Sequence, residues 1–182
     1  MPEPEVRSLS LAEWLVLCLV CEKPRHGFDI ARVLGRDGSM GQVWRVPKPV
    51  VYRALQRLEQ LALVHGGEPQ ASSQGPARSL VDATQSGRAA AAAWLARPVE
   101  HTRDVRSELL MKLALLDRAG ADPQPLLEAQ RDLLLPVADA LRDRLGAAHG
   151  FDRALLLWRY ETVSATVRFL DALREQANAP AR

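Results

Sequence analysis

Residues 47–66 read PKPVVYRALQRLEQLALVHG, and their hydrophobic pattern changes along the stretch from helical to extended. Pro47 and Pro49 suit a first helical turn, where backbone N–H groups have no partner inside the helix. The stretch therefore predicts an amphipathic helix that opens near Pro47 and is followed directly by a short strand at 63–65. Its apolar residues, spaced by three and four, are Val51, Leu55, Leu58 and Ala62.

The opposite face of this helix is polar and largely basic. A lysine or a tyrosine hydroxyl can bond a DNA phosphate, and Arg or Gln side chains can read base edges from a helix in the major groove. Within residues 36–57 the single acidic side chain is Asp37, against Arg36, Arg45, Lys48, Arg53 and Arg57. A solvated basic surface is the alternative interpretation. The candidate DNA-binding residues on the helix are Lys48, Tyr52, Arg53, Gln56 and Arg57.

The segment after this helix predicts a hairpin. Two short strands, at 63–65 and 78–82, flank a tip rich in Gly, Ser, Gln and Pro. A hairpin that follows a basic helix is the layout of a wing, whose tip reaches the adjacent DNA backbone, so Gln74 and Arg78 are further DNA-binding candidates. Thr84 then suits the N-cap of a helix that continues through Trp94 and ends before Pro98.

Upstream, the first predicted helix begins at a capping box. Ser10 and Glu13 have the spacing at which each side chain bonds the other residue's backbone N–H. After Glu13 the helix is apolar on every side, and a helix without a polar face must be covered all round. We therefore expect a partner chain to complete the cover, with Trp14 and Leu15 in a dimer interface.

A second helix is predicted over residues 27–34, with Gly35 as its stop. Phe28, Ala31 and Leu34 recur at helical spacing, and we expect them to share one face of this helix. A short loop or strand through Trp44 leads on to the basic helix. The order of helix, helix, helix and hairpin predicts a winged-helix DNA-binding domain over residues 1–97.

Residues 98–182 predict three more helices, over about 104–118, 122–145 and 151–176. The last carries an apolar stripe with further apolar residues on both sides, wider than one neighbour covers. A symmetric interface with the first helix of a second chain would cover it, and a homodimer matches a palindromic operator. A monomeric helical bundle is the alternative. The expected interface residues of the stripe are Phe151, Leu155, Trp158, Thr162 and Phe169.

The predicted fold class is therefore mainly α: a winged helix-turn-helix with a two-stranded wing, followed by a C-terminal α-helical dimerisation region. Five stretches also resemble the PadR family of winged-helix transcriptional regulators, in order and in spacing. The resemblance implies the same fold, dimers held by C-terminal helices, and a ligand-responsive repressor. The stretches are PRHGF at 24–28, VYRAL and RLE at 51–59, GPAR at 75–78, TQSGR at 84–88 and SELLMKL at 107–113.

Two positions depart from the family pattern. Pro49-Val50 stands where the family commonly has Gly-Thr before the tyrosine motif, so the phosphate contact of a threonine hydroxyl is missing. Ala62 stands where a glycine is usual before Leu63-Val64. A winged-helix scaffold that mediates protein–protein interaction instead of binding DNA is the alternative function.

Other features of the sequence limit the classes of protein to which the chain can belong. The longest apolar run, at 14–21, is shorter than the roughly 20 residues that cross a bilayer, and residues 1–7 lack the pattern of a secretory signal, so we expect a cytoplasmic protein without a membrane span. Cys18 and Cys21 have a C-x-x-C spacing, but inside an apolar helix they are expected to be buried and structural. The four histidines show no metal-ligand spacing, and no catalytic constellation assembles. We expect no metal, no cofactor and no enzymatic activity.

A small-molecule effector is a further hypothesis. Tryptophans at helical spacing are more often core than ligand-binding, but Trp158 is a candidate for an aromatic pocket. A ligand between the winged helix and the C-terminal helices would act through residues 98–103, which lack strong periodicity and form the expected hinge.

Overall fold

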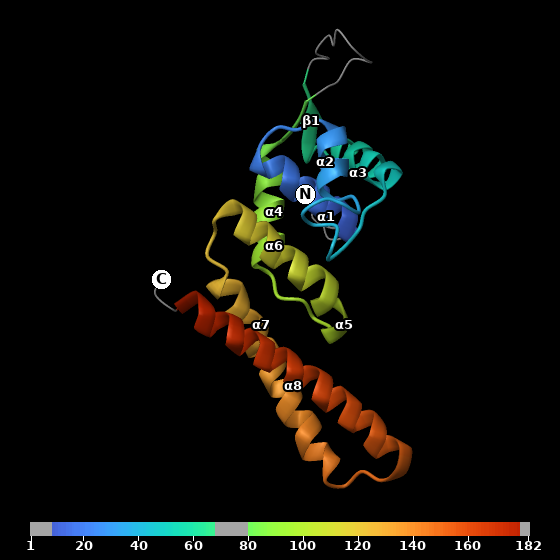
Figure 1. Ribbon diagram of the computed structural model, residues 1–182, viewed down its shortest axis with the longest axis vertical. Helices are drawn as coiled ribbons and strands as arrows, with labels where there is room; N and C mark the ends of the chain where they lie inside the picture. The colour runs from blue at the N-terminus through green and yellow to red at the C-terminus, as the bar shows by residue number, and fades with distance from the viewer. Residues whose placement is uncertain (1–8, 68–79, 179–182) are drawn as a thin grey trace. The chain divides into compact units, whose positions relative to one another are not determined.

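The protein was analysed as a computed structural model, which describes residues 9–67 and 80–178 (Figure 1). The chain divides into two compact units. The first comprises Met1–Leu95 and Leu110–Gly120, and the second comprises Ala96–Leu109 and Ala121–Arg182. The first unit contains α1 (Leu11–Glu22), α2 (Gly27–Val33), α3 (Lys48–Gln60), β1 (Val64–Gly66), β2 (Val81–Ala83), most of α4 (Gln85–Ala96) and α6 (Leu110–Ala119).

Helix α1 is the centre of the first unit. Its capping box forms as predicted, because the Glu13 N–H donates to the Ser10 hydroxyl and the Ser10 N–H donates to the Glu13 carboxylate over 2.6 Å. Trp14 and Leu15 are 8% and 0% exposed, within a run of buried residues that extends to Val20. Contacts with α3, β2 and α6 supply this cover.

The premise that α1 needs a partner chain is therefore wrong. Trp14 and Leu15 are enclosed by their own chain and have almost no surface left to offer a second one. The sequence argument assumed that one small domain seldom covers an all-apolar helix, whereas α3, β2 and α6 of the same chain cover this one.

Helix α2 buries a different face from the one expected. Gly27, Ile30 and Leu34 are buried, whereas Ala31 is only partly buried. Phe28 is 49% exposed, so the three residues expected on one face of this helix are not buried together. The physical reason is rotation of the helix about its axis: its contact with α3 passes through Gly27, where the absence of a side chain allows the closest approach.

Helix α3 is amphipathic as predicted, and it ends before Ala62. Val51, Leu55 and Leu58 are buried, but Ala62 is exposed and outside the helix, contrary to the expectation that it belongs to the core face. Ala62 has a φ of 52°, the left-handed conformation that terminates many helices and favours glycine. The Leu63 N–H donates to the Leu58 carbonyl over 2.9 Å and closes the helix end.

The two strands after α3 form the predicted antiparallel hairpin. Val64 pairs with Ala83, His65 with Asp82 and Gly66 with Val81, so the strands lie one residue or more beyond the expected 63–65 and 78–82. A bridge between Arg25 and Val81 adds the segment before α2 to the edge of this sheet. The order of three helices and a hairpin confirms the winged helix.

Helix α4 begins where it was predicted. The Gly87 N–H donates to the Thr84 hydroxyl over 3.0 Å, so Thr84 caps the first turn. Thr84 also donates to the Ala62 carbonyl, which ties the start of α4 to the end of α3. A side chain at Gly87 would lie 2.0 Å from the Leu63 carbonyl oxygen, so only glycine allows this close approach.

Helix α6 joins the first unit, although it lies beyond the boundary expected at residue 97. Met111, Lys112 and Leu115 are 0%, 1% and 3% exposed, and the two apolar side chains belong to the same core as α1. The first unit is therefore discontinuous in sequence, because its core draws a helix from the C-terminal half of the chain.

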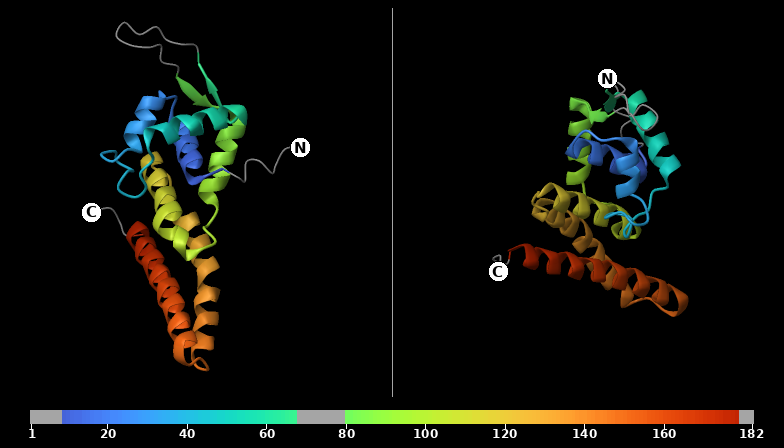
Figure 2. Two further views of the ribbon diagram at one scale, coloured as in Figure 1. Left: turned by 90° about the vertical axis from the view of Figure 1, so that its right-hand side faces the viewer. Right: turned by 45° about the horizontal axis from the view of Figure 1, so that its top comes forward.

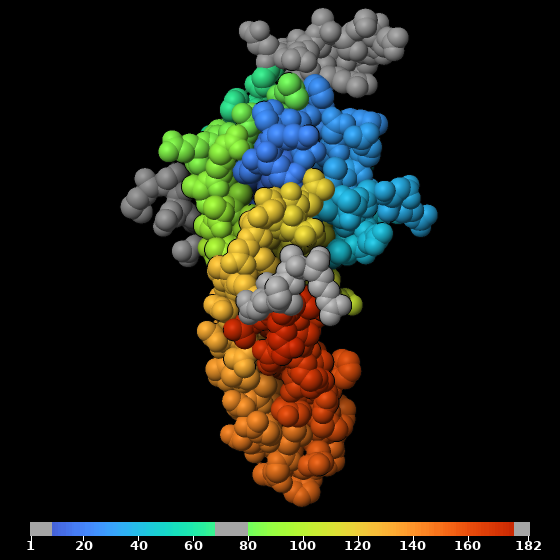
Figure 3. All heavy atoms as spheres, turned by 60° about the vertical axis from the view of Figure 1, so that its left-hand side comes forward, coloured from blue at the N-terminus to red at the C-terminus, as the bar shows by residue number. Residues whose placement is uncertain are grey.

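The second unit consists mainly of two long helices, α7 (Gln124–Leu145) and α8 (Gly150–Asn178), which pack side by side in both ribbon views (Figures 1 and 2). Figure 3 shows their side chains forming one continuous two-helix layer, α7 in orange and α8 in red. The unit also contains α5 (Thr102–Asp104) and a π-helical turn (Val105–Leu109). Residues 102–119 are helical without a gap, as expected for about 104–118, and the π-helical turn lies within this run. The other two C-terminal helices are as predicted. None of the helices within residues 9–67 and 80–178 has the length and apolarity to cross a membrane.

Candidate nucleic-acid interface

The candidate DNA-binding residues of α3 share its exposed face. The opposite face anchors the helix, with Val51, Ala54, Leu55 and Leu58 buried in the core of the first unit. Gln74 and Arg78 lie outside the described residues. The exposed set is Lys48, Tyr52, Arg53, Gln56 and Arg57.

A cluster of aromatic and basic side chains lies at the N-terminal end of α3. The Lys48 ammonium is 5.4 Å from the centroid of the Phe28 ring and 6.0 Å from that of the Tyr52 ring. Tyr52 is 43% exposed, and its ring lies against Gly27, where an added Cβ would be 3.0 Å from the Tyr52 Cε1 atom. Sequence reasoning missed Phe28, since helical spacing cannot show which side of a short helix meets its neighbour.

Arginines hold the base of the hairpin against the helices. The backbone N–H of Arg25 donates to the Val81 carbonyl over 3.0 Å, and the backbone N–H of Val81 donates to the Arg25 carbonyl over 2.9 Å. Arg88 donates to the Asp82 carboxylate over 2.6 Å and to the Cys21 carbonyl over 2.9 Å. These bonds fix the position of β2, the second strand of the hairpin, relative to α1 and α4.

Helices α1 and α6 are joined by an ion-pair cluster. Arg118 donates to both carboxylate oxygens of Glu22, each over 2.9 Å, and Arg25 donates to the same carboxylate. Burial alone raises the pKa of Glu22, but the hydrogen bond and charge of Arg118, followed by those of Arg25, outweigh burial and lower the pKa below its usual value. Arg118 also donates to the Ser39 hydroxyl in the loop that leads to α3.

Two of the four tryptophans belong to the core. The rings of Trp14 and Trp94 stack with centroids 5.4 Å apart and an interplanar angle of 7°, and the Lys112 ammonium lies 4.6 Å from the Trp94 centroid. Trp44 and Trp158 are 42% and 71% exposed. Trp158, the candidate for an aromatic pocket, lines a cavity of the second unit.

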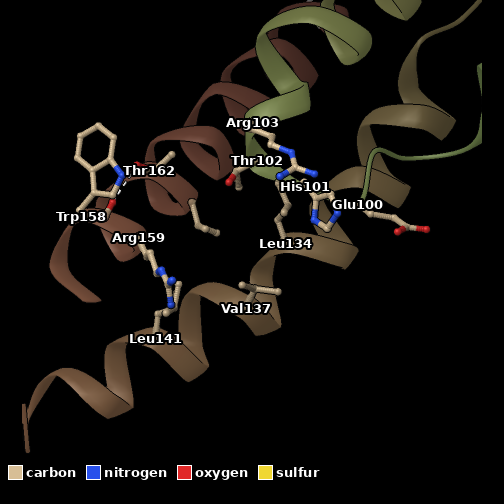
Figure 4. Close-up of a pocket in the computed structure, with 11 residues that line it drawn as sticks. Glu100, His101, Thr102, Arg103, Leu134, Val137, Leu141, Trp158, Arg159 and Thr162 are labelled. Atoms are coloured by element: carbon tan, nitrogen blue, oxygen red, sulfur yellow. Dashed lines mark hydrogen bonds between the residues drawn. The ribbon is translucent and has the colours of Figure 1, made fainter. Parts of the chain in front are cut away.

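This cavity has a volume of about 520 Å³ (Figure 4). Arg103 of α5 and Arg159 of α8 lie at opposite ends of it in this view, whereas the indole of Trp158 points away from the residues of α7. The cavity is formed by the second unit alone, while sequence reasoning placed a ligand between the two regions. Its lining residues are Glu100, His101, Thr102, Arg103, Leu134, Val137, Leu141, Trp158, Arg159, Thr162 and Val163.

The two cysteines are free thiols; Cys18 is buried as expected, whereas Cys21, expected to be buried, is only partly buried. Burial raises the pKa of both, that of Cys21 to about 11 and that of Cys18 further, with the nearby Cys21 and Glu22 adding to the effect at Cys18. Raised pKa values keep the thiols protonated and poorly nucleophilic. In the part of the chain that the structure describes, no three His, Cys, Asp or Glu side chains are grouped to hold a metal ion.

Comparison with known families matches residues 16–93 to the transcriptional regulator PadR-like family. A Mycobacterium tuberculosis protein described as "Probable transcriptional regulator Rv1176c" is 29% identical over 111 residues, which are 57% of this chain and 53% of the relative. The match thus spans about half of the curated relative's length.

Solved structures with similar folds include PadR of Bacillus subtilis in complex with operator DNA, at 18% identity and a TM-score of 0.48, covering 93% of this chain and 100% of that one. The same protein in complex with p-coumaric acid has 17% identity and a TM-score of 0.41, with 98% and 99% coverage. The PadR-like regulator BC1756 from Bacillus cereus has 19% identity and a TM-score of 0.40, with 93% and 99% coverage.

Proposed function

We propose that the chain is a PadR-like homodimeric repressor that binds double-stranded DNA and responds to a small-molecule effector, because residues 16–93 match the transcriptional regulator PadR-like family. The observation that supports DNA binding best is the exposed polar face of α3. This face carries lysine, arginine, tyrosine and glutamine side chains, and the opposite face of the same helix is buried. The hairpin follows the helix directly.

Each side chain on this face has a distinct role in the proposal. Lys48 and the Tyr52 hydroxyl bond phosphates at the N-terminal end of α3. Arg53, next to Tyr52 in the sequence, and Gln56, one turn beyond Tyr52, read base edges in the major groove, because both can make paired hydrogen bonds to a purine. Arg57 contacts the backbone, as do Gln74 and Arg78 of the wing.

The test compares Arg53→Ala and Lys48→Ala on a duplex selected from fragments of the source genome. Arg53→Ala should weaken binding by on the order of 1–3 kcal/mol, chiefly for the selected sequence. Lys48→Ala should weaken binding to all sequences and flatten the dependence of log K on log salt by about one unit. Arg168→Ala removes an exposed arginine of α8 and serves as the matched control. Unchanged affinity in both test variants at matched salt would contradict the reading role of α3.

The dimer is proposed on the surface of α8. Leu156, Val163 and Leu170 are buried within the chain, so α7 covers one side of this helix. Most of the expected interface stripe is exposed, with Phe151 at 80% and Trp158 at 71%, whereas Thr162 is partly buried. A second copy of the chain is the proposed cover, since two identical stripes can meet about a two-fold axis and present two recognition helices to a palindromic operator. The stripe further includes Leu155, Thr162 and Phe169.

The effector is proposed to bind in the cavity of the second unit, with Trp158 at its rim. Residues 100–103 line this cavity and belong to the expected hinge. A ligand bound there would therefore contact the segment that follows α4. Arg103 and Arg159 suit an anionic ligand. An effector that weakens DNA binding must itself bind more weakly to the protein–DNA complex. Titrating p-coumaric acid, an aromatic carboxylate, into free protein and into the complex is a first test, and equal affinities would exclude it as an effector.

The alternative function is a winged-helix scaffold for protein–protein interaction. It predicts that no DNA is retained when the protein is used to select from a random-sequence pool. Recovery of an enriched sequence whose affinity depends on Arg53 would exclude the scaffold.

A further inference from the structure

Phe28 occupies a position that the packing of the first unit does not explain. It is 49% exposed at the start of α2, on the side away from the buried Ile30 and Leu34. An aromatic ring left half in water adds little to the core. Its exposed ring lies instead beside the first turn of α3, next to the Lys48 ammonium.

The contact geometry around Lys48 is specific. The ammonium is within about 6 Å of two aromatic centroids, the range in which the ring quadrupole attracts a cation. The two rings come from different helices, Phe28 from α2 and Tyr52 from α3, and Gly27 allows the Tyr52 ring to lie against α2. The position of the ammonium is thus set by both helices.

We propose that Phe28 is a positioning residue of the DNA interface, whose ring, together with that of Tyr52, holds the Lys48 ammonium where it meets a phosphate. This inference rests on the proposed function of Lys48 as a phosphate contact. Phe28 does not bond the DNA in this arrangement but acts through Lys48.

The physical reason is the flexibility of lysine. Its four-carbon stem has many rotamers, and ordering it on a phosphate costs conformational entropy. Two ring faces restrict the stem before DNA arrives and so lower that cost. Since an ammonium has three N–H donors, the ring faces leave donors available for a phosphate oxygen. Phe28 therefore changes affinity without changing the number of charges that meet the DNA.

The experiment measures binding to a fluorescent duplex of mixed sequence across a potassium chloride titration. Phe28→Leu keeps an apolar side chain of similar size but removes the ring. It should weaken binding by about two- to five-fold and leave the slope of log K against log salt unchanged, because the released counterions are the same. Phe28→Tyr restores a ring and should restore the lost affinity. Lys48→Ala should reduce the slope by about 0.9.

The double variant separates the possible roles. If Phe28 acts through Lys48, then Phe28→Leu has no further effect in the Lys48→Ala background. An equal loss in both backgrounds overturns the inference, because Phe28 would then touch DNA or act through the fold. No loss from Phe28→Leu in the wild-type background also overturns it, provided that Lys48→Ala changes the slope. A slope unchanged by Lys48→Ala instead removes the proposed function of Lys48, and the inference falls with it.

Discussion

Replacing Trp158 by aspartate tests the proposed dimer interface at the centre of its stripe. A tryptophan side chain buries up to roughly 250 Å², and Trp158 is 71% exposed in the single chain. About 180 Å² of this side chain per protomer is thus available to a partner, and its burial stabilises the dimer by about 4 kcal/mol at 25 cal/mol per Å². The substitution removes this contribution from both protomers of a symmetric dimer. Ordering side chains at the interface offsets part of it. We therefore expect dimerisation to weaken by at least roughly 4 kcal/mol, about a thousand-fold in the dissociation constant.

The assay is sedimentation velocity over a series of protein concentrations. The substitution should leave the fold intact, since the side chain lies mostly outside the contact between α7 and α8, and circular dichroism checks this. Trp44→Asp, at a 42% exposed tryptophan of the first unit, controls for the loss of any exposed indole. A Trp158→Asp protein that dimerises like the Trp44→Asp control would refute the interface on α8.

Three further predictions concern the first unit. Ala62→Gly should raise the free energy of unfolding by ~0.5–1 kcal/mol, because glycine accepts the φ of 52° without strain; chemical denaturation measures this, and a destabilised variant would contradict it. Arg118→Gln should cost about 2 kcal/mol at neutral pH. Because the folded protein lowers the pKa of Glu22, the ionised carboxylate stabilises the fold above its usual pKa of 4.5, and this stabilisation is lost as pH falls below that value. The difference in unfolding free energy between Arg118→Gln and the wild type should therefore shrink on acidification. A difference that stays constant with pH would exclude Glu22 as the cause. Cys18 and Cys21 should react with a thiol reagent at mildly alkaline pH only after unfolding, because burial raises both pKa values; rapid reaction of the folded protein would contradict this.

Local signals predicted the elements well. The capping box at Ser10, the first turn at Pro47 and the cap at Thr84 each satisfy backbone groups within a few residues, so their effect does not depend on the rest of the fold. The same holds for the polar face of α3, since a periodic pattern over three turns leaves one orientation of the helix.

Two predictions went wrong where the pattern was short or uniform. Helix α2 has seven residues, too few for spacing to show which face meets α3, and the expected face grouped the exposed Phe28 with the buried Leu34. Helix α1 is apolar all round, so its pattern shows that it is covered but not by what. Cover by a second chain and cover by α6 give the same pattern in the sequence.

The sequence by itself determined the order of helices and hairpin, the ends of most helices, and the polar face of α3, because these follow from interactions between residues close together in the chain. Only the tertiary structure decided that Met111 and Leu115 complete the core around α1, that Lys48 lies between Phe28 and Tyr52, and that Arg103 and Arg159 share one cavity. These contacts join residues far apart in sequence. Their existence depends on how whole helices rotate and pack, which no local pattern specifies.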